Sequence, residues 1–413
     1  MLAAKQLFAL ASSSKPQAEP AFLRERVDTY YRERAVNAVT GGHILKGRIP
    51  GADDLILTSN DYLSISRHPA IMQAQAETLH AQGHGVLRSS VFLFGETPQR
   101  ALERALAHAT QAEDALVAQS GWCANTGLIQ AIANAETPVY LDMFAHMSLW
   151  EGVHAAGATP RPFRHNRVEA LDTLIAKHGP GLVIVDSVYS TNGSVCPLPA
   201  VVDVATRHGC VILVDESHSL GVFGTAGEGM VAALGLTDQV HFRTASLSKA
   251  YAARGGLILG SVRNMEYLRY ASRPAIFSSG LLPHELAGLQ ATLQVVSEAN
   301  DRREQVLDNA RYLRAKLAGL GYDVGQDESQ ILALVPGAEH LTIQLRDALE
   351  ARGVFGSVFC DPATPRNRSL IRFTINAAHT RAELARVAAV CAEVRDVVDL
   401  AQWPEARKRG EAA

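Results

Sequence analysis

Two short segments near the middle of the chain hold side chains that can take part in acid–base and covalent chemistry. Residues 213–224 have the sequence LVDESHSLGVFG, in which an apolar run ends at Asp215 and His218 follows three residues later. Residues 244–256 have the sequence TASLSKAYAARGG, which brings the hydroxyl of Ser246 close to the amine of Lys249. Each of these residues taken alone is more often a core or surface residue than a functional one. Their order along the chain predicts a shared site.

An acid, an imidazole, a lysine and hydroxyl groups are together what a protein needs to hold pyridoxal phosphate. The lysine amine forms a Schiff base with the aldehyde, the acid pairs with the pyridine nitrogen, and the hydroxyl groups bind the phosphate. The five cysteines include no C-x-x-C pair, which argues against a zinc site and against a disulfide framework. We therefore expect pyridoxal 5'-phosphate as the cofactor and no metal.

The strands that position these residues are expected to form a mainly parallel sheet. Apolar runs of strand length alternate with helical patterns, which is typical of strands that are covered on both faces. The expected strands are 138–141, 181–185, 211–214 and 256–259. Two of them are followed at once by an acid, Asp186 and Asp215. Because ligands bind beyond the carboxyl ends of strands in open parallel sheets, we expect both acids at the site.

After the sheet, the pattern changes to that of a second, smaller domain. A long helical stretch over 285–317 precedes segments that predict strands at 330–334, 353–359 and 370–375 and a helix over 380–397. The predicted fold class is α/β, with a mainly parallel large domain and a smaller α+β domain towards the C-terminus. We expect an N-terminal helical arm at 1–58, the cofactor-binding domain at 59–285, the small domain at 286–400 and a solvated tail at 401–413.

Composition narrows the class of protein further. The 39 Lys and Arg residues against 42 Asp and Glu give a net charge of −3, so nucleic acid is not an expected partner. No stretch approaches the roughly 18 apolar residues of a membrane-spanning helix, and the apolar run at 7–11 is too short for a secretory signal. Dispersed cysteines in odd number fit a reducing compartment. These features predict a cytoplasmic location.

Several longer motifs resemble those of one known family. They are AQSGWCANTGL (118–128), FAHMSLWEG (144–152), HGPGLVIVDSVYSTNG (178–193), VDESHSLG (214–221), RPAIFSSGLLPHE (273–285) and GVFGSVFCDPAT (353–364). Over about residues 60–376 the chain resembles the α-oxoamine synthases, which are fold type I pyridoxal-phosphate enzymes. Within that family it is most similar to the cholera-type synthases of α-hydroxyketone quorum-sensing autoinducers. The resemblance implies a fold type I transferase that acts as a homodimer, with active sites at the subunit interface.

The resemblance also implies roles around the cofactor ring. Lys249 would form the Schiff base and then move the Cα proton of the substrate, and Asp215 would pair with the pyridine nitrogen. His146 would stack on the ring, while His218 and Ser190 would bond its phenolic oxygen. The acid beside them would be Asp186. Lys249, His146, Asp215 and His218 form the implied catalytic set.

Further residues would hold the phosphate and the substrates. The phosphate would meet the backbone of Ser120, Gly121 and Trp122, where a loop enters a helix, and the hydroxyl of Ser246. The segment with Ser278 and Ser279 would reach the partner subunit's phosphate. Arg372 would bind the amino-acid carboxylate through its forked guanidinium, and Asn60 and Tyr62 belong to a motif near the substrate channel.

The implied reaction is a decarboxylative condensation of an α-amino acid with a medium-chain fatty acyl-CoA, which gives an amino-ketone precursor of the autoinducer. The implied amino acid is 2-aminobutyrate or S-adenosylmethionine. Where the broader family has G-x-G-G-S-R, residues 83–88 are GHGVLR, a departure that fits a wide apolar acyl channel. Residues 91–94, VFLF, are either part of that channel or a plain buried edge.

Other activities compete with this hypothesis. The chain could instead make 8-amino-7-oxononanoate, 2-amino-3-ketobutyrate, 5-aminolevulinate or 3-ketosphinganine, as sister enzymes do. It could also be a non-catalytic partner subunit, which the joint presence of Lys249, His218 and Asp215 argues against. A dinucleotide-binding oxidoreductase is excluded because no G-x-G-x-x-G follows a first strand.

Overall fold

The computed structural model of the chain describes residues 19–35, 44–93, 95–365, 367–400 and 403. These residues fall into two compact units, 1–49 and 50–413. In the first unit, helix α2 (Ala21–Tyr30) continues into one π-helical turn, η1 (Tyr31–Ala35), and no residue of α2 is buried. Part of the predicted N-terminal arm is therefore helical, whereas residues 1–18 and 36–43 lie outside the described residues.

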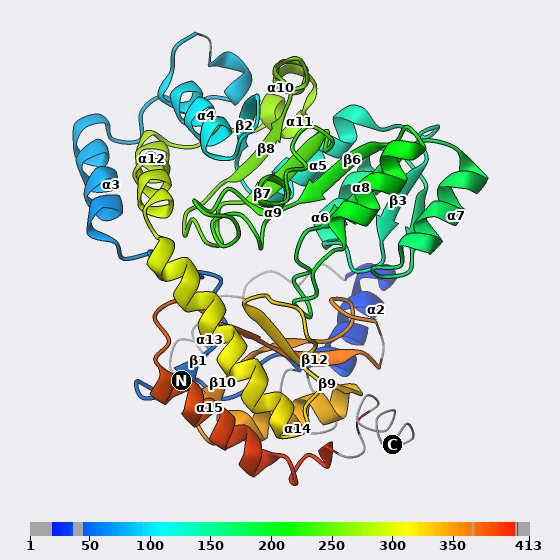
Figure 1. The fold of residues 1–413 in the computed structure, drawn as a ribbon, viewed down its shortest axis with the longest axis vertical. Coiled ribbons are helices and arrows are strands. Elements are labelled where there is room, and N and C mark those ends of the chain that lie inside the picture. Colours follow the sequence, from blue (N-terminus) through cyan, green and yellow to red (C-terminus); the bar gives the residue numbers. More distant parts are fainter. Residues whose placement is uncertain (1–18, 36–43, 94, 366, 401–402, 404–413) are drawn as a thin grey trace. The chain divides into compact units, whose positions relative to one another are not determined.

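A seven-stranded sheet forms the centre of the second unit (Figure 1). Its strand order is β2-β8-β7-β6-β5-β3-β4. β8 runs antiparallel to both of its neighbours, and the pairs among β3, β4, β5, β6 and β7 are parallel. The strands are β2 (Asp114–Ala118), β3 (Val139–Asp142), β4 (Pro160–Phe163), β5 (Leu182–Asp186), β6 (Val211–Asp215), β7 (Phe242–Ser246) and β8 (Gly256–Gly260). The predicted mainly parallel sheet is confirmed.

Helices bury both faces of this sheet because successive strand side chains point to opposite sides. On one face, α7 (Val168–His178) and α8 (Leu198–Arg207) pack on side chains such as Val185 and Val214. On the other face, α5 (Gly121–Ile132), α6 (Met147–Ala155) and α10 (Val262–Ala271) pack on side chains such as Ile184 and Leu213. This double cover explains why β5 and β6 are almost continuous apolar runs.

A third group of helices, α3 (Pro69–Gln82), α4 (Pro98–Ala109) and α12 (Pro283–Ser297), completes the large domain around β2, β7 and β8. α12 contributes Leu289, Leu293 and Val296 to this core. The domain boundary that we expected at 285/286 therefore falls inside α12. The predicted helix over 285–317 is in fact two helices, because the chain turns between α12 and α13 (Asn300–Gly319).

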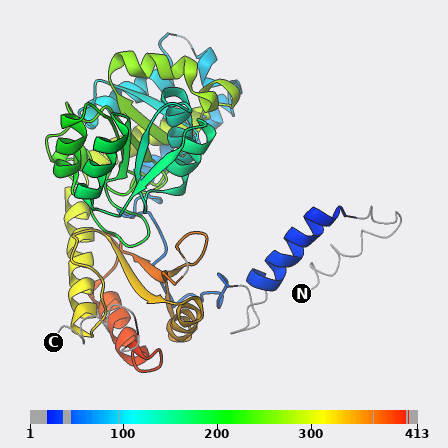
Figure 2. The same ribbon diagram turned by 90° about the vertical axis from the view of Figure 1, so that its right-hand side faces the viewer.

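The smaller domain has its own core and its own sheet. Helix α13, yellow in Figures 1 and 2, extends from the large domain into the small one. There β11 (Ser357–Phe359), β12 (Ser369–Thr374) and β9 (Ile331–Gly337) form an antiparallel sheet, packed by α14 (Glu339–Glu350) and α15 (Arg381–Val394). The predicted strand at 353–359 splits between two sheets, since β10 (Val354–Phe355) pairs with β1 (Leu55–Ile56).

Both ends of this core differ from the predicted boundaries. Leu57, which we expected in the arm, is 1% exposed and packs in the small-domain core. Trp403, which we expected in a solvated tail, is 4% exposed, and its ring lies 5.7 Å from that of Tyr322. These apolar side chains find partners in the small domain, so its packing includes both of them. Residues 404–413 lie outside the described residues.

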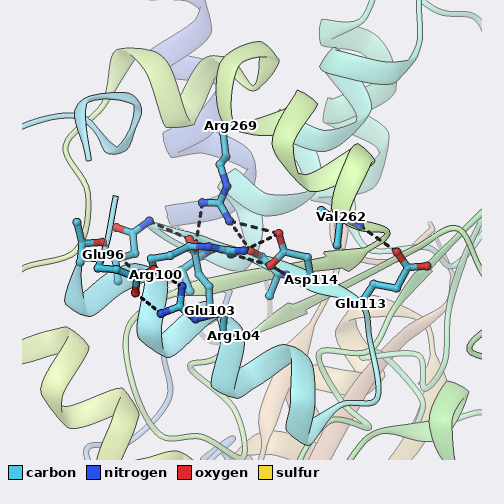
Figure 3. A network of polar contacts seen from close by, with 12 residues as sticks. Glu96, Arg100, Glu103, Arg104, Glu113, Asp114, Val262 and Arg269 are labelled. Atoms are coloured by element: carbon cyan, nitrogen blue, oxygen red, sulfur yellow. Dashed lines mark hydrogen bonds and ion pairs between the residues drawn. The ribbon is translucent and has the colours of Figure 1, made fainter. Parts of the chain in front are cut away.

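A network of ion pairs fastens α4 and α10 to β2 (Figure 3). Arg100 binds Asp114 with both of its terminal nitrogens, at 2.6 and 3.0 Å. Arg269 from α10 lies 2.7 Å from the buried Glu103, and Arg104 pairs with Glu96. Each guanidinium in this cluster has a carboxylate partner, so the cluster stabilises the fold and leaves no arginine there for a ligand. None of the helices in the described ranges is both long and apolar enough to cross a bilayer.

Candidate active site

The carboxyl edge of the parallel strands holds most of the predicted cofactor-binding residues in one cavity. Asp186 ends β5 and Asp215 ends β6, and the two residues are register partners in the sheet. Ser246 ends β7, and Lys249 follows in the next turn. The cavity is lined by Gly121, Trp122, Asn125, His146, Ser148, Asp186, Asp215, Ser217, His218, Ser246 and Lys249.

The carboxylate of Asp215 is buried and held in a single orientation. One oxygen accepts a hydrogen bond from Asn125 Nδ2 at 2.7 Å, and the other accepts the backbone N–H of Ser217 at 2.8 Å. Thr244 Oγ1 in turn donates to Asn125 Oδ1 at 2.6 Å, which fixes the amide of Asn125. A carboxylate so fixed can pair with a protonated ring nitrogen, because its position does not depend on the ligand.

Lys249 lies in surroundings that favour its neutral form. Burial lowers the pKa of the Lys249 amine, and the positive charge of Arg372 lowers it further, while Asp215 opposes both effects. A neutral amine is the nucleophile that forms a Schiff base and the base that removes a proton. The surroundings of Lys249 therefore favour both Schiff-base formation and proton removal by its amine.

The beginning of α5 forms an anion-binding cradle beside β7. The first amide groups of a helix have no acceptor within that helix, so the N–H groups of Gly121 and Trp122 are available to a phosphate. Gly121 is tightly placed, because a Cβ there would lie 2.7 Å from the Cβ of Ser246. Ser120 is the N-cap, and its hydroxyl accepts the N–H of Cys123 at 3.1 Å. Ser120 therefore shapes the cradle with its side chain.

Two neutral histidines face the cavity. His146 is the N-cap of α6. Its backbone N–H donates to Asp186 Oδ2 at 3.1 Å, and its ring Nδ1 lies 2.8 Å from Ser148 Oγ. Burial lowers the pKa of His146. The pKa of His218 lies well below its ordinary value, first because of burial and then because of the charges of Lys249 and Arg372. Both imidazoles can therefore accept or donate hydrogen bonds without carrying charge.

The pKa of Asp186 is raised well above its ordinary value by burial and then by the negative charge of Asp215. Its carboxyl group still accepts the backbone N–H of His146. The protonated form of Asp186 is thus favoured relative to an exposed aspartate. We infer that Asp186 holds the turn that carries His146 in place, because it accepts the backbone N–H of that residue.

The predicted carboxylate-binding residue, Arg372 on β12, is buried and aligned by neighbours from three segments. Its Nη1 donates to the carbonyl of Ser190 at 2.8 Å, and its Nη2 lies 3.5 Å from Asn60 Oδ1. The guanidinium also lies 4.7 Å from the centre of the Phe359 ring. Its Nε is buried without a hydrogen-bond partner among the described residues. An unpaired buried donor of this kind suits a carboxylate ligand.

Seven predicted site residues are not among those that line the cavity: Ser120, Ser190, Ser278, Ser279, Arg372, Asn60 and Tyr62. Ser190 contributes its carbonyl to Arg372, and Tyr62 is fully buried with its hydroxyl 2.6 Å from His218 Nδ1. Ser278 Oγ donates to the carbonyl of Pro274, and the carbonyl of Ser279 accepts from Gln119 Nε2. The cross-subunit role of these two serines stays a prediction.

The predicted acyl channel is likewise not part of this cavity. Val91 and Leu93 line a different cavity, together with Arg100 and Tyr270. Phe92 is 56% exposed, and Phe94 lies outside the described residues. Three residues of the Lys249 cavity were not predicted from the sequence: Asn125, Ser148 and Ser217. Asn125 could have been found, because it follows Gly121 by one helical turn and so shares its face.

Comparison with known proteins identifies the family. The model of the aminotransferase class I and II family matches residues 52–390. The chain belongs to this family. A CAI-1 autoinducer synthase from Vibrio campbellii is 43% identical over 383 residues, which cover 92% of this chain and 97% of that protein. An 8-amino-7-oxononanoate synthase from Bacillus pumilus is 32% identical and covers 82% of this chain and 87% of that protein.

Solved structures agree with this assignment. A serine palmitoyltransferase from Sphingomonas wittichii has a TM-score of 0.81 and 25% identity, over 94% of this chain and 100% of that one. A structure titled as SPT with the PLP internal aldimine has a TM-score of 0.81 and 29% identity, over 92% and 97% of the two chains. The predicted α-oxoamine synthase family and fold type I architecture are confirmed. The chain is therefore an enzyme of the acyltransferase type.

Proposed function

We propose that the protein is a pyridoxal-phosphate-dependent synthase of an α-hydroxyketone autoinducer precursor. It condenses a small α-amino acid, of the 2-aminobutyrate or S-adenosylmethionine type, with a medium-chain fatty acyl-CoA and releases coenzyme A and carbon dioxide. The observation that carries this proposal is the meeting of Lys249, Asp215 and the start of α5 in one cavity. The 43% identity to a CAI-1 autoinducer synthase supports the choice among the sister activities.

The residues of the cavity fit pyridoxal phosphate. The amine of Lys249, the fixed carboxylate of Asp215 and the amide groups at the start of α5 match its aldehyde, ring nitrogen and phosphate. The chemistry that this cofactor supplies when bound is withdrawal of electrons from the bonds at the substrate Cα. His146 would lie against the ring, and the Ser246 hydroxyl would bind the phosphate.

The protein's own residues orient the substrate and move its proton. Arg372 holds the carboxylate, which decides which bond at Cα lies perpendicular to the ring plane. Lys249 Nζ then removes the Cα proton, since its lowered pKa supplies the neutral amine. His218 would donate from its Nε2 to the phenolic oxygen of the cofactor and so help to orient the ring.

We propose that the protein binds a second copy of this chain and forms a homodimer. A cytoplasmic location stays a prediction. The segment of Ser278 and Ser279 contacts Gln119, next to the α5 cradle, from outside the cavity. Phe277 is 80% exposed beside it, which suits burial against another subunit. We propose that this segment reaches the partner subunit's phosphate.

The 8-amino-7-oxononanoate synthase activity is the second candidate, because relatives of that name cover most of the chain. One experiment separates the two. The purified protein is loaded with pyridoxal phosphate and incubated with a panel of acyl-CoAs and either 2-aminobutyrate, S-adenosylmethionine, alanine or glycine. The masses of the products are then determined by mass spectrometry. We expect the mass of an amino-ketone that carries a medium-length fatty acyl chain. Turnover only with alanine or glycine and short acyl donors would contradict the proposal.

A further inference from the structure

An aspartate, a histidine and a serine form a hydrogen-bonded row behind the candidate active site. Asp142 ends β3 and is fully buried; its Oδ1 lies 2.9 Å from His165 Nδ1. On the other side of the ring, His165 Nε2 lies 2.9 Å from Ser194 Oγ. None of the three residues lines the Lys249 cavity. Ser194 is 9% exposed, so this row is built to connect segments inside the protein.

The ring of His165 is packed against two aromatic rings. Phe144 stacks on it with ring centres 4.2 Å apart, and Tyr189 meets it edge-on at 4.5 Å. The next residue, Asn166, adds two bonds: its N–H donates to Asp142 Oδ2 at 2.9 Å, and its side chain donates to the carbonyl of Val195 at 2.9 Å. His165 and Asn166 therefore fasten residues 194 and 195 to the end of β3.

The loop 189–195 that they fasten contacts the small domain with its opposite side. The carbonyl of Ser190 accepts from Arg372 Nη1 at 2.8 Å, and the carbonyl of Gly193 accepts from Ser329 Oγ at 2.6 Å. Gly193 has a φ of +75°, and a Cβ there would lie 2.2 Å from the carbonyl oxygen of Ile331. The loop thus connects the end of β3 to the small domain. Its Ser190 carbonyl is one of the groups that hold Arg372.

We propose that His165 is a positioning residue for the carboxylate-binding guanidinium: it ties loop 189–195 to Asp142 and so places the Ser190 carbonyl that orients Arg372. The inference rests on the proposed function, because it takes Arg372 as the group that binds the amino-acid carboxylate. Asp142 also accepts the N–H of Phe144 at 2.8 Å, in the turn that leads to His146. One buried carboxylate therefore anchors both the His146 turn and the Arg372 loop.

The partners fix one proton of the imidazole. The carboxylate of Asp142 accepts hydrogen bonds, so His165 Nδ1 carries a proton. Ser194 Oγ lies 2.9 Å from His165 Nε2 and donates to Asn192 Oδ1 at 2.8 Å. A phenylalanine at 165 keeps the stacking on Phe144 but loses both hydrogen bonds. Alanine at 194 removes the contact with His165 and the hydrogen bond from Ser194 Oγ to Asn192 Oδ1, and leaves the bond between Asp142 and His165 in place.

The first test uses the cofactor-free chain and hydrogen–deuterium exchange. In His165→Phe and in Ser194→Ala, we expect the amides of residues 189–196 to exchange about tenfold faster than in the wild type. The matched control is His208→Phe, which breaks another histidine–aspartate contact, 2.6 Å from His208 Nε2 to Asp172 Oδ1, between the C-cap of α8 and helix α7. It should leave this peptide unchanged. Unchanged exchange in His165→Phe would overturn the inference, because Ser194→Ala also loses the bond to Asn192 within the loop.

The second test measures binding of 2-aminobutyrate and, separately, of glycine to the loaded protein from the change in visible absorption. Both test variants should bind the amino acid about tenfold more weakly, with cofactor affinity unchanged. In an Arg372→Ala background, His165→Phe should cause no further loss, because the two residues act in series. If His165→Phe weakens amino-acid binding by a further tenfold in the Arg372→Ala background, the proposal is contradicted. A wild-type chain that binds no cofactor would refute the proposed function, while the exchange test would still decide the role of His165.

Discussion

The hydroxyl of Tyr62 lies 2.6 Å from Nδ1 of His218, although 156 positions separate the two residues. Tyr62 is fully buried, and its pKa is raised by that burial, so the phenol keeps its proton. His218 is neutral because its pKa is well below the ordinary value. The phenol lies 3.4 Å from Asn60 Oδ1 and only 2.6 Å from His218 Nδ1, so we infer that it donates to Nδ1 and that the proton of the imidazole is on Nε2. Tyr62 thus sets the tautomer with which His218 can donate to a ligand.

Replacing Tyr62 by Phe removes this hydrogen bond and keeps the ring. We expect kcat to fall about tenfold, as for the loss of one buried hydrogen bond, together with a shift in the visible absorption of the bound cofactor. The control is Tyr322→Phe, which removes a buried hydroxyl bond to the carbonyl of Cys391 in the small domain. That change should lower the free energy of unfolding and leave the spectrum as it is. Equal spectra for Tyr62→Phe and wild type would contradict the account.

Replacing Asp215 by Ala leaves the ring nitrogen of the cofactor without its partner and Asn125 Nδ2 without an acceptor at 2.7 Å. Breaking a buried charge pair from one side costs about 3–5 kcal/mol. We expect weaker cofactor binding in an absorbance titration and a lower rate at saturating cofactor. Asp203→Ala, on the exposed side of α8, should change neither quantity. Wild-type cofactor affinity in Asp215→Ala would show that this carboxylate does not face the ring.

Replacing Gly121 by Ala places a methyl group 2.7 Å from the Cβ of Ser246. Either α5 or β7 must move, which separates the amide groups from the Ser246 hydroxyl. We expect at least about tenfold weaker binding of the cofactor phosphate. Gly319→Ala is the matched control, because nothing lies within 4 Å of the added carbon. It should be neutral or stabilise the protein by about 0.4–1 kcal/mol. Equal cofactor affinities in the two variants would contradict the claim that the start of α5 binds the cofactor phosphate.

The lowered pKa of His218 predicts a loss of stability in acid. The unfolded chain takes up a proton at this histidine below about pH 6.5, whereas the folded protein does not. The stability contributed by neutral His218 is therefore complete above that pH and is lost as the pH falls. His218→Gln should make the free energy of unfolding less steep between about pH 7 and 5, by up to roughly 1.4 kcal/mol per pH unit. Denaturant titrations measure this, with His80→Gln as the exposed control. Parallel curves for His218→Gln and wild type would contradict a neutral His218.

Elements with a strong local signal could be predicted from the sequence. The apolar runs of β5 and β6, each ending in an acid, identified both the sheet and the edge at which Asp186 and Asp215 lie. β4 has the sequence PRPF at the edge of the sheet, where proline is tolerated, and its composition gave no strand signal. The break between α12 and α13 contains neither glycine nor proline, so one long helix was expected.

The contacts that assemble the site are tertiary, and local patterns do not encode them. Tyr62 was expected near the substrate channel, which stays a prediction, and its contact with His218 could not be read from the sequence. The link from Ser190 to Arg372 joins residues 182 positions apart and uses a backbone carbonyl, which any residue type could supply. Ser217 holds Asp215 by its backbone N–H, which any residue type except proline could supply. For such residues, the geometry is the first evidence of a role.

The central claim is that the amine of Lys249 joins the cofactor aldehyde. It is tested most directly by adding pyridoxal phosphate to the purified protein, reducing with borohydride and mapping the labelled peptide by mass spectrometry. The account predicts a visible absorption band that borohydride removes, with the label on Lys249, and neither band nor label in Lys249→Ala. A label on another lysine of the wild-type chain, or a protein that stays colourless with added cofactor, would contradict it.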